Sequence, residues 1–303
     1  MFINVGFLKI WPMRKISLFI LGVFTVIVLH AQSTDQQTPP KSRRFHVGIG
    51  YSFIQTDMKL TDMTTQSFWN GTSGEKHDFN DDEINDLNSR EKSTRKYQSI
   101  AVEAGMILLN KPGGKWFIDG TIMIGLASAN YKIWNNEIDT IEMVIKSGLS
   151  LPSFGLLFNI RYNFNPHWGI SVMPEARYSF GVNKQIDDNI YGKIEYFNES
   201  RKCNYNYLYG NINLLAAYTI KGLTISAGPG FYTLYNTNFY KLERVNPANG
   251  DTYRTEVKTS LVPRAFIDGN IVVEWKIIDL LTLTAYGALG KDFIVRGAIR
   301  CNL

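Results

Sequence analysis

The residues of this chain best suited to chemistry lie in one polar stretch near residue 80. An imidazole and three carboxylates fall close together there: His77, Asp78, Asp81 and Asp82. Such a set could activate a water molecule by general acid–base catalysis. The same stretch is crowded with acidic residues and asparagines, a composition typical of a solvated loop. We therefore expect no catalytic residues and no enzymatic activity.

Metal and cofactor motifs are equally sparse. Asp78, Asn80 and Asp82 have the alternate spacing of a calcium loop, but the turn glycine and closing glutamate of that pattern are absent. Glycine-rich phosphate loops and zinc-ligand spacings do not occur. Cys203 and Cys301 are predicted near opposite ends of the fold, beyond disulfide reach. We expect no metal, no cofactor and two free thiols.

A second set of charged residues occurs inside segments that otherwise look like strands. These residues occupy the polar positions of an alternating pattern: Glu103, Asp119, Arg161, Glu175, Arg177, Arg264, Asp268, Glu274, Arg296 and Arg300. Acids and arginines balance, and buried charge is very costly unless it is paired. The set therefore predicts an ion-pair network that plugs the interior of a narrow barrel. A thin, charge-lined pore for small solutes remains the alternative.

The elements that would position these residues are strands. Apolar and polar residues alternate with a period of two, which is the signature of a strand with one apolar face. Ten segments show it: 45–53, 99–108, 116–126, 156–164, 168–180, 207–218, 223–231, 264–275, 281–286 and 293–303. The pattern predicts an all-β, antiparallel, up-and-down transmembrane barrel of about ten strands.

The connectors between these segments alternate in length. Tight turns are predicted at 110–114, 165–166, 221–222 and 276–279, and long polar segments at 57–96, 130–149, 182–204 and 237–259. Short periplasmic turns and long extracellular loops are typical of outer-membrane barrels. Segments 139–146 and 190–197 could add or extend strands, so eight or twelve strands remain open. Asn249-Gly250 predicts the tip of a hairpin.

The start of the chain predicts export. Residues 1–31 are interpreted as a signal peptide, of which 1–12 are expected to precede the true start codon. Its apolar run, Ile16 to Leu29, is shorter than the roughly 20 residues of a membrane-spanning helix. Residues 32–43 form a polar periplasmic tether, and 44–303 the barrel. The net charge of +5 includes three basic residues of this signal, so the pI does not indicate a nucleic-acid partner.

Aromatic residues distinguish a membrane barrel from a soluble one. Several lie on the apolar parity within a few residues of a tight turn, where a belt at the membrane interface is expected: Trp116, Phe164, Trp168, Tyr218 and Trp275. Tyr51, Phe53, Tyr178, Phe180 and Tyr235 could form the second belt. A periplasmic lipocalin-like barrel with core aromatics is the alternative. We expect the protein in the bacterial outer membrane.

With its His30-Ala31-Gln32 signal end, ten strands and terminal strand 293–303, the chain resembles small outer-membrane β-barrel proteins of the Bacteroidetes type, including the PorT-like group. The resemblance implies membrane insertion, with outer-membrane lipid, lipopolysaccharide and the barrel-assembly machinery as partners. It does not imply a shared activity. We expect a structural or interaction role at the cell surface or in a secretion or envelope complex. The acids and histidine near residue 80 leave an omptin-like protease as a second alternative.

Overall fold

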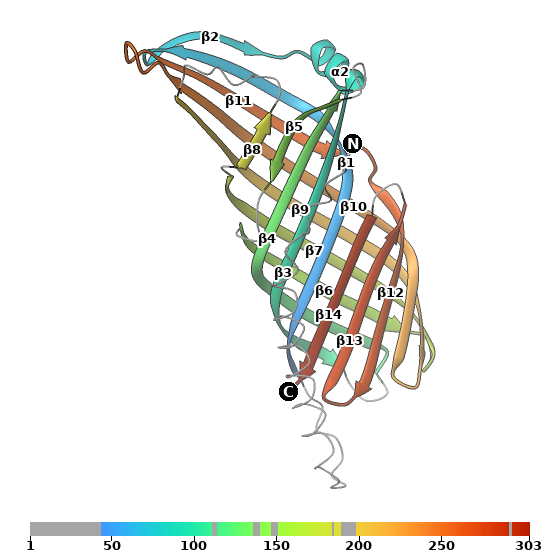
Figure 1. Cartoon of the computed structure of the whole chain (residues 1–303). Helices are drawn as coiled ribbons and strands as arrows, with labels where there is room; N and C mark the ends of the chain where they lie inside the picture. Colours follow the sequence, from blue (N-terminus) through green and yellow to red (C-terminus); the bar gives the residue numbers. More distant parts are fainter. Residues whose placement is uncertain are drawn as a thin grey trace, which may run out of the picture. The chain divides into compact units, whose positions relative to one another are not determined.

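The computed structural model describes residues 44–110, 114–135, 140–146, 151–183, 185–188, 198–290 and 293–303. The predicted signal peptide and tether, residues 1–43, lie outside the described residues. The described part is dominated by one antiparallel sheet (Figure 1).

Ten strands of this sheet form a closed ring, as the alternating pattern predicted. Each pairs antiparallel with the next, and the last pairs with the first. In order they are β1 (Phe45–Trp69), β3 (Glu91–Asn110), β4 (Trp116–Asn135), β6 (Leu151–Asn163), β7 (Trp168–Asn183), β9 (Asn198–Ile220), β10 (Leu223–Val245), β12 (Ile267–Ile278), β13 (Leu281–Leu289) and β14 (Phe293–Asn302). All ten predicted segments map onto these strands.

The tight turns follow from local chemistry. Lys221 and Gly222 both have positive φ, 45° and 82°, which matches the two-residue turns that suit the twist of antiparallel strands. At the β6–β7 turn, the Asn165 side-chain oxygen accepts hydrogen bonds from the backbone N–H groups of His167 and Trp168, both at 2.9 Å. These turns connect strands that are neighbours in the ring.

The long connecting segments are present on one side of the ring, and strands continue through much of them. β1 and β10 run well beyond the ring, and β11 (Thr252–Pro263) pairs with both of them. β11 therefore occupies the space between β1 and β10 above the shorter strands β12, β13 and β14 (Figure 1). The β10–β11 hairpin closes at Asn246–Asp251, as Asn249-Gly250 predicted. We call residues 57–91 and 237–263 the strand extension.

Besides β11, three short strands of the described part lie outside the ring. β2 (Thr72–Asp78) pairs with the end of β1. β5 (Thr140–Lys146) pairs with β4 and with β8 (Gln185–Asp188), so segment 139–146 contains an added strand but not an eleventh member of the ring. Most of segment 190–197 lies outside the described residues.

The acidic stretch near residue 80 is a helix rather than the solvated loop we expected. Helix α2 (Asp81–Arg90) starts with a capping box: the Asn80 side chain accepts from the backbone of Glu83, whose carboxylate accepts from the Asn80 N–H. Acids in the first turn favour a helix N-terminus. In the described part of the chain, no helix is long and apolar enough to cross a bilayer.

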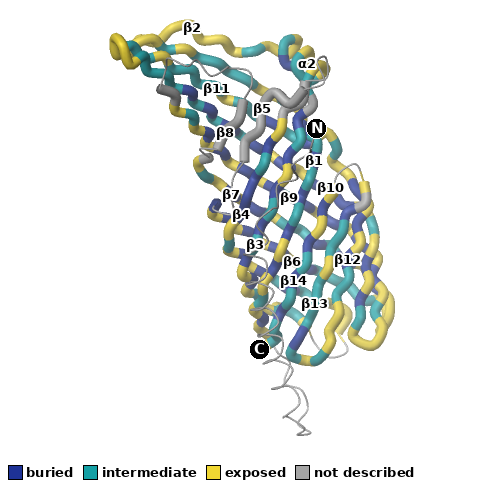
Figure 2. The backbone as a smooth tube through the Cα atoms, in the orientation of Figure 1, coloured by how far each residue is buried: buried dark blue, intermediate teal, exposed yellow. Residues whose placement is uncertain are grey.

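Burial alternates along the ring strands with the predicted parity, as Figure 2 shows. The outward side chains of β4 and β9 include exposed Ile122, Ile124, Ile212 and Leu214. The inward side chains include buried Glu103, Asn159 and Arg177. A soluble antiparallel barrel has the opposite arrangement, with apolar residues inside. The outer wall of this ring is therefore suited to hydrocarbon rather than to water.

Candidate functional site: a closed barrel interior

The interior of the ring is the place where most of the predicted charged residues meet. Nine of the ten lie there: Glu103, Asp119, Arg161, Glu175, Arg177, Asp268, Glu274, Arg296 and Arg300. Arg264 does not, and its assignment is wrong. The strand predicted over 264–275 begins only at Ile267, so Arg264 lies in the exposed β11–β12 connection, where it donates to backbone oxygens of Met58 and Asn88.

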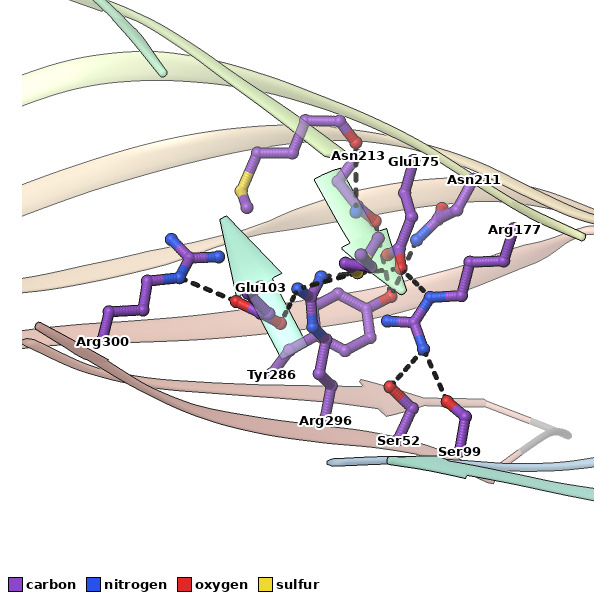
Figure 3. Close-up of polar contacts among 12 residues, drawn as sticks. Ser52, Ser99, Glu103, Glu175, Arg177, Asn211, Asn213, Tyr286, Arg296 and Arg300 are labelled. Carbon is purple, nitrogen blue, oxygen red and sulfur yellow. Dashed lines mark hydrogen bonds and ion pairs between the residues drawn. The ribbon is translucent and has the colours of Figure 1, made fainter. Parts of the chain in front are cut away.

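Glu103 is at the centre of the charged layer. Its carboxylate accepts from Arg296 Nη2 at 2.6 Å and from Arg300 Nε at 2.9 Å (Figure 3). The Glu103 side chain is 1% exposed, and both arginines come from β14. Charge-assisted hydrogen bonds of this kind are stronger than neutral ones. One carboxylate therefore holds two arginines inside the barrel.

The ion pairs continue toward the opposite wall. Arg296 Nη1 lies 3.5 Å from Glu175 on β7, and Glu175 in turn accepts from Arg177 Nε at 2.5 Å. Arg177 also donates to the hydroxyls of Ser52 on β1 and Ser99 on β3 (Figure 3). These contacts link strands on different sides of the ring, so the side chains cross the lumen instead of lining it.

The layer also extends toward the tight turns. Arg300 Nη1 lies 3.7 Å from Asp119, and Asp119 lies 3.6 Å from His46 Nδ1. His46 Nε2 contacts the Thr121 hydroxyl at 3.1 Å. Nothing in the sequence indicated this contact, because His46 and Thr121 are 75 residues apart. A separate pair, Arg161 with Glu274, is supported by a hydrogen bond from Asn159 to Glu274 at 3.0 Å.

Asp268 is the exception among the inward acids. It is buried, and neither carboxylate oxygen has a hydrogen-bond partner among the described residues. Asp268 Oδ1 lies close to Gly290, where an added Cβ would overlap that oxygen. Asp268 is therefore inside the barrel but outside the ion-pair network described above.

An aromatic layer lies beyond the charged one and was not predicted. Tyr97 and Tyr207 stack face to face with their ring centroids 4.3 Å apart. The Tyr97 hydroxyl reaches Ser153 and Ser179 across the ring, at 3.0 and 2.8 Å. Further buried side chains pack around the stack: Ile54, Met58, Tyr205, Tyr209, Tyr232, Leu234 and Leu261. The sequence does carry a sign of this layer, because Tyr205, Tyr207 and Tyr209 occupy alternate, inward-facing positions of β9.

Little space remains between these side chains. A cavity among Glu175, Glu274, Tyr286, Arg296 and Arg300 has a volume of about 20 Å³. A single water molecule needs roughly 10–15 Å³ by the same measure. This cavity therefore has room for about one water molecule.

The acids and histidine near residue 80 do not converge. His77 contacts Glu83 at 3.0 Å, whereas Asp78 accepts from Lys76 at 2.6 Å and Thr64 at 2.8 Å. These hydrogen bonds, that from Lys76 first, hold the pKa of the Asp78 carboxyl below its usual value. Asp81 and Asp82 occupy the first turn of α2. Among the described residues, no group of three or more His, Cys, Asp and Glu side chains could hold a metal ion.

The predicted interface aromatics all point outward near the tight turns. Trp116, Phe164, Trp168, Tyr218 and Trp275 are exposed, and Trp168 packs against Tyr218 with ring centroids 4.8 Å apart. Tyr51, Tyr178, Phe180 and Tyr235 are exposed at the other end of the apolar wall. Cys203 and Cys301 are both free cysteines. A closed antiparallel barrel with an apolar wall, aromatics at both of its ends and a polar interior defines the transmembrane β-barrels of the bacterial outer membrane.

Comparison with solved structures finds similarity to outer-membrane proteins. The translocator domain of autotransporter NalP from Neisseria meningitidis is similar at 9% identity and a TM-score of 0.41, over 95% of this chain and 98% of that one. The outer membrane protease OmpT from Escherichia coli is similar at 10% identity and a TM-score of 0.40, over 88% of this chain and 99% of that one. The outer membrane protein OprG from Pseudomonas aeruginosa is similar at 9% identity and a TM-score of 0.33, over 87% of this chain and 98% of that one. Identities of this size transfer no activity. No protein-family model and no curated protein matches the sequence.

Proposed function

We propose that this protein is a closed outer-membrane barrel whose role is structural or interaction-based. The observation that carries the proposal is the double obstruction of the lumen. The pairs of Arg296 with Glu175 and of Arg177 with Glu175 and Ser52 cross it at one level, and the Tyr97–Tyr207 stack crosses it at another. A ten-stranded barrel is narrow, and side chains from opposite walls meet in the middle. Under this proposal the barrel anchors a surface rather than conducting solutes.

The surface that it would present is the far end of the strand extension. There Trp69 packs edge-on against Tyr253 with ring centroids 3.9 Å apart, and both rings are exposed. Asn70 fastens the β1–β2 turn to β11, because its side chain accepts from Thr252 N at 2.7 Å and donates to Asp251 at 2.8 Å. Rigid, exposed aromatics among polar groups are typical of binding surfaces. We infer that this tip contacts a partner outside the cell.

The finer assignments belong to the same proposal. The sequence resemblance supports a member of the Bacteroidetes-type, PorT-like barrels that serves a secretion or envelope complex. Outer-membrane lipid, lipopolysaccharide and the barrel-assembly machinery are its proposed partners. We propose no enzymatic activity, because His77 contacts Glu83 of the helix cap whereas Asp78 binds Thr64 and Lys76.

Photo-crosslinking in intact cells tests the surface role. A crosslinking residue in place of Trp69 is expected to give a defined adduct with a second protein. The matched position is Lys132, which is exposed on β4 away from the tip and is expected to give none. Equal labelling from both positions, or none from Trp69, would contradict a binding role for the tip.

Incubation of the folded protein with peptides and lipopolysaccharide tests the protease alternative. We expect no turnover above that of a His77→Ala variant. Turnover that this variant or Asp81→Ala abolishes would establish an enzyme and overturn the proposal.

A further inference from the structure

Arg95 is a buried cation without a buried anion. It is 2% exposed and is among the largest of the fully buried side chains in the described part of the chain. Its guanidinium carbon lies 4.5 Å from the centre of the Tyr131 ring, and Nη2 donates one long hydrogen bond, 3.5 Å, to Asn238 Oδ1. Arg95 Nε has no hydrogen-bond partner. Within the described residues, no carboxylate forms an ion pair with it.

The groups around Arg95 are neutral but polar. Its electrostatic neighbours are Tyr131, Tyr205, Tyr207 and Cys203, none of which is an acid at neutral pH. The hydroxyl of Tyr207 is buried without a hydrogen-bond partner. A guanidinium offers five N–H donors in a planar fork, and a phenol offers one more. The cluster therefore holds more donors than acceptors.

This arrangement contrasts with the charged layer on the same strand. Glu103 on β3 binds two arginines, whereas Arg95 on β3 has no carboxylate. Burying an unpaired ionised group is far more costly than burying a paired one. Arginine cannot escape by losing its proton, because its pKa is too high. The cation–π contact with Tyr131 offsets only part of that cost.

We propose that Arg95 and the hydroxyl of Tyr207 form an anion-binding site in the barrel interior. The chemistry selects a small anion, a halide or a carboxylate, since the fork of a guanidinium matches carboxylate oxygens. Arg95 lies two residues beyond Tyr97 on the inward face of β3, on the side of the strand extension. Arg95 and the charged layer around Glu103 are therefore at different levels of β3. The site does not depend on whether the lumen conducts.

Thermal unfolding under exchange of anions tests the site. The folded barrel in detergent is heated in sodium gluconate, sodium chloride or sodium formate at constant ionic strength. Unfolding is followed by the change in gel migration between the folded and the unfolded barrel. A ligand that binds only the folded state raises the midpoint. Chloride and formate are expected to raise it by about 2–5 °C over gluconate. Arg95→Met is expected to remove this response.

The matched control is Lys96→Met, which removes an exposed cation next to Arg95 in the chain. It is expected to keep the full response to chloride and formate. A wild-type midpoint that is the same in all three salts would overturn the proposal. A response that persists in Arg95→Met would overturn it too, because the anion would then act elsewhere.

Anomalous X-ray diffraction from wild-type crystals grown in sodium bromide gives a readout that does not need the variant to fold. We expect an anomalous bromide peak in direct contact with the guanidinium nitrogens of Arg95. No peak at Arg95, with bromide bound elsewhere or not at all, would show that no exchangeable anion occupies the cluster and would overturn the site.

Discussion

Glu103 and Arg300 meet across a glycine. Gly48 of β1 is the register partner of Glu103 on β3 and also of Arg300 on β14. Because Gly48 has no side chain, Arg300 Nε reaches over β1 to Glu103 at 2.9 Å. His46 and Thr121 meet in the same way across Gly105, their common register partner. Glycines on the inward parity therefore determine which strands the interior contacts can bridge.

A methyl group at Gly48 is expected to disturb this contact. A Cβ there would overlap the Ile299 carbonyl oxygen and press on the Arg300 side chain. Overpacking of this kind costs about 1–3 kcal/mol. We therefore expect Gly48→Ala to lower the free energy of unfolding by that amount, measured by urea titration of the barrel in lipid vesicles.

Gly287→Ala is the control for that experiment. An added Cβ at Gly287 meets nothing within 4 Å, so stability should be unchanged or slightly higher. If both variants lose the same stability, the effect belongs to strand glycines in general and not to the contact across Gly48.

Removing the Glu103 carboxylate is expected to be more damaging. Glu103→Gln removes the carboxylate that both Arg296 and Arg300 contact and leaves them only the longer pairs with Glu175 and Asp119. Breaking a buried ion pair from one side typically costs about 3–5 kcal/mol. The surface pair Lys276–Asp279 provides the comparison, since its side chains are 51% and 64% exposed. Asp279→Asn should cost less than about 1 kcal/mol. Similar losses for the two variants in the same urea titration would show that Glu103 is not a buried hub.

The depth of single tryptophans tests the membrane assignment. A variant whose only tryptophan is Trp168 should be quenched strongly by lipids brominated on the acyl chains, because Trp168 is exposed on the outer wall at a tight turn. A variant that keeps only Trp69 should be quenched weakly, because Trp69 lies at the far end of β1. Quenching of Trp69 that matches or exceeds that of Trp168 would contradict the assigned membrane boundary.

The ring could be predicted from the sequence because lipid contact imposes a strict period of two. Ile122 and Ile124 face outward while Thr121 and Met123 face inward, and ten such segments define ten strands. The strand extension could not be predicted in the same way. Beyond the membrane neither face of a strand must be apolar, so β11 and the end of β1 show no alternation of apolar and polar residues. These strands pair through their backbones, which does not constrain the residue types.

The interior could be predicted as a set of residues but not as a set of contacts. Parity identifies Glu103, Glu175 and Arg296 as inward, whereas their pairing depends on strand register and on glycines such as Gly48. The prediction for Arg264 was wrong because the alternation of β12 was extended back over residues 264–266, which precede the strand. Arg95 was missed because it lies in a segment predicted to be a loop.

Electrical recording in planar lipid bilayers tests the closed lumen most directly. The account predicts that wild-type protein inserts without a steady, ohmic current. It also predicts that Arg177→Ala or Glu175→Ala, each of which breaks the 2.5 Å pair in the charged layer, gives currents that the silent wild-type barrel does not. A stable, voltage-independent conductance from folded wild-type protein would contradict the account and favour the narrow pore.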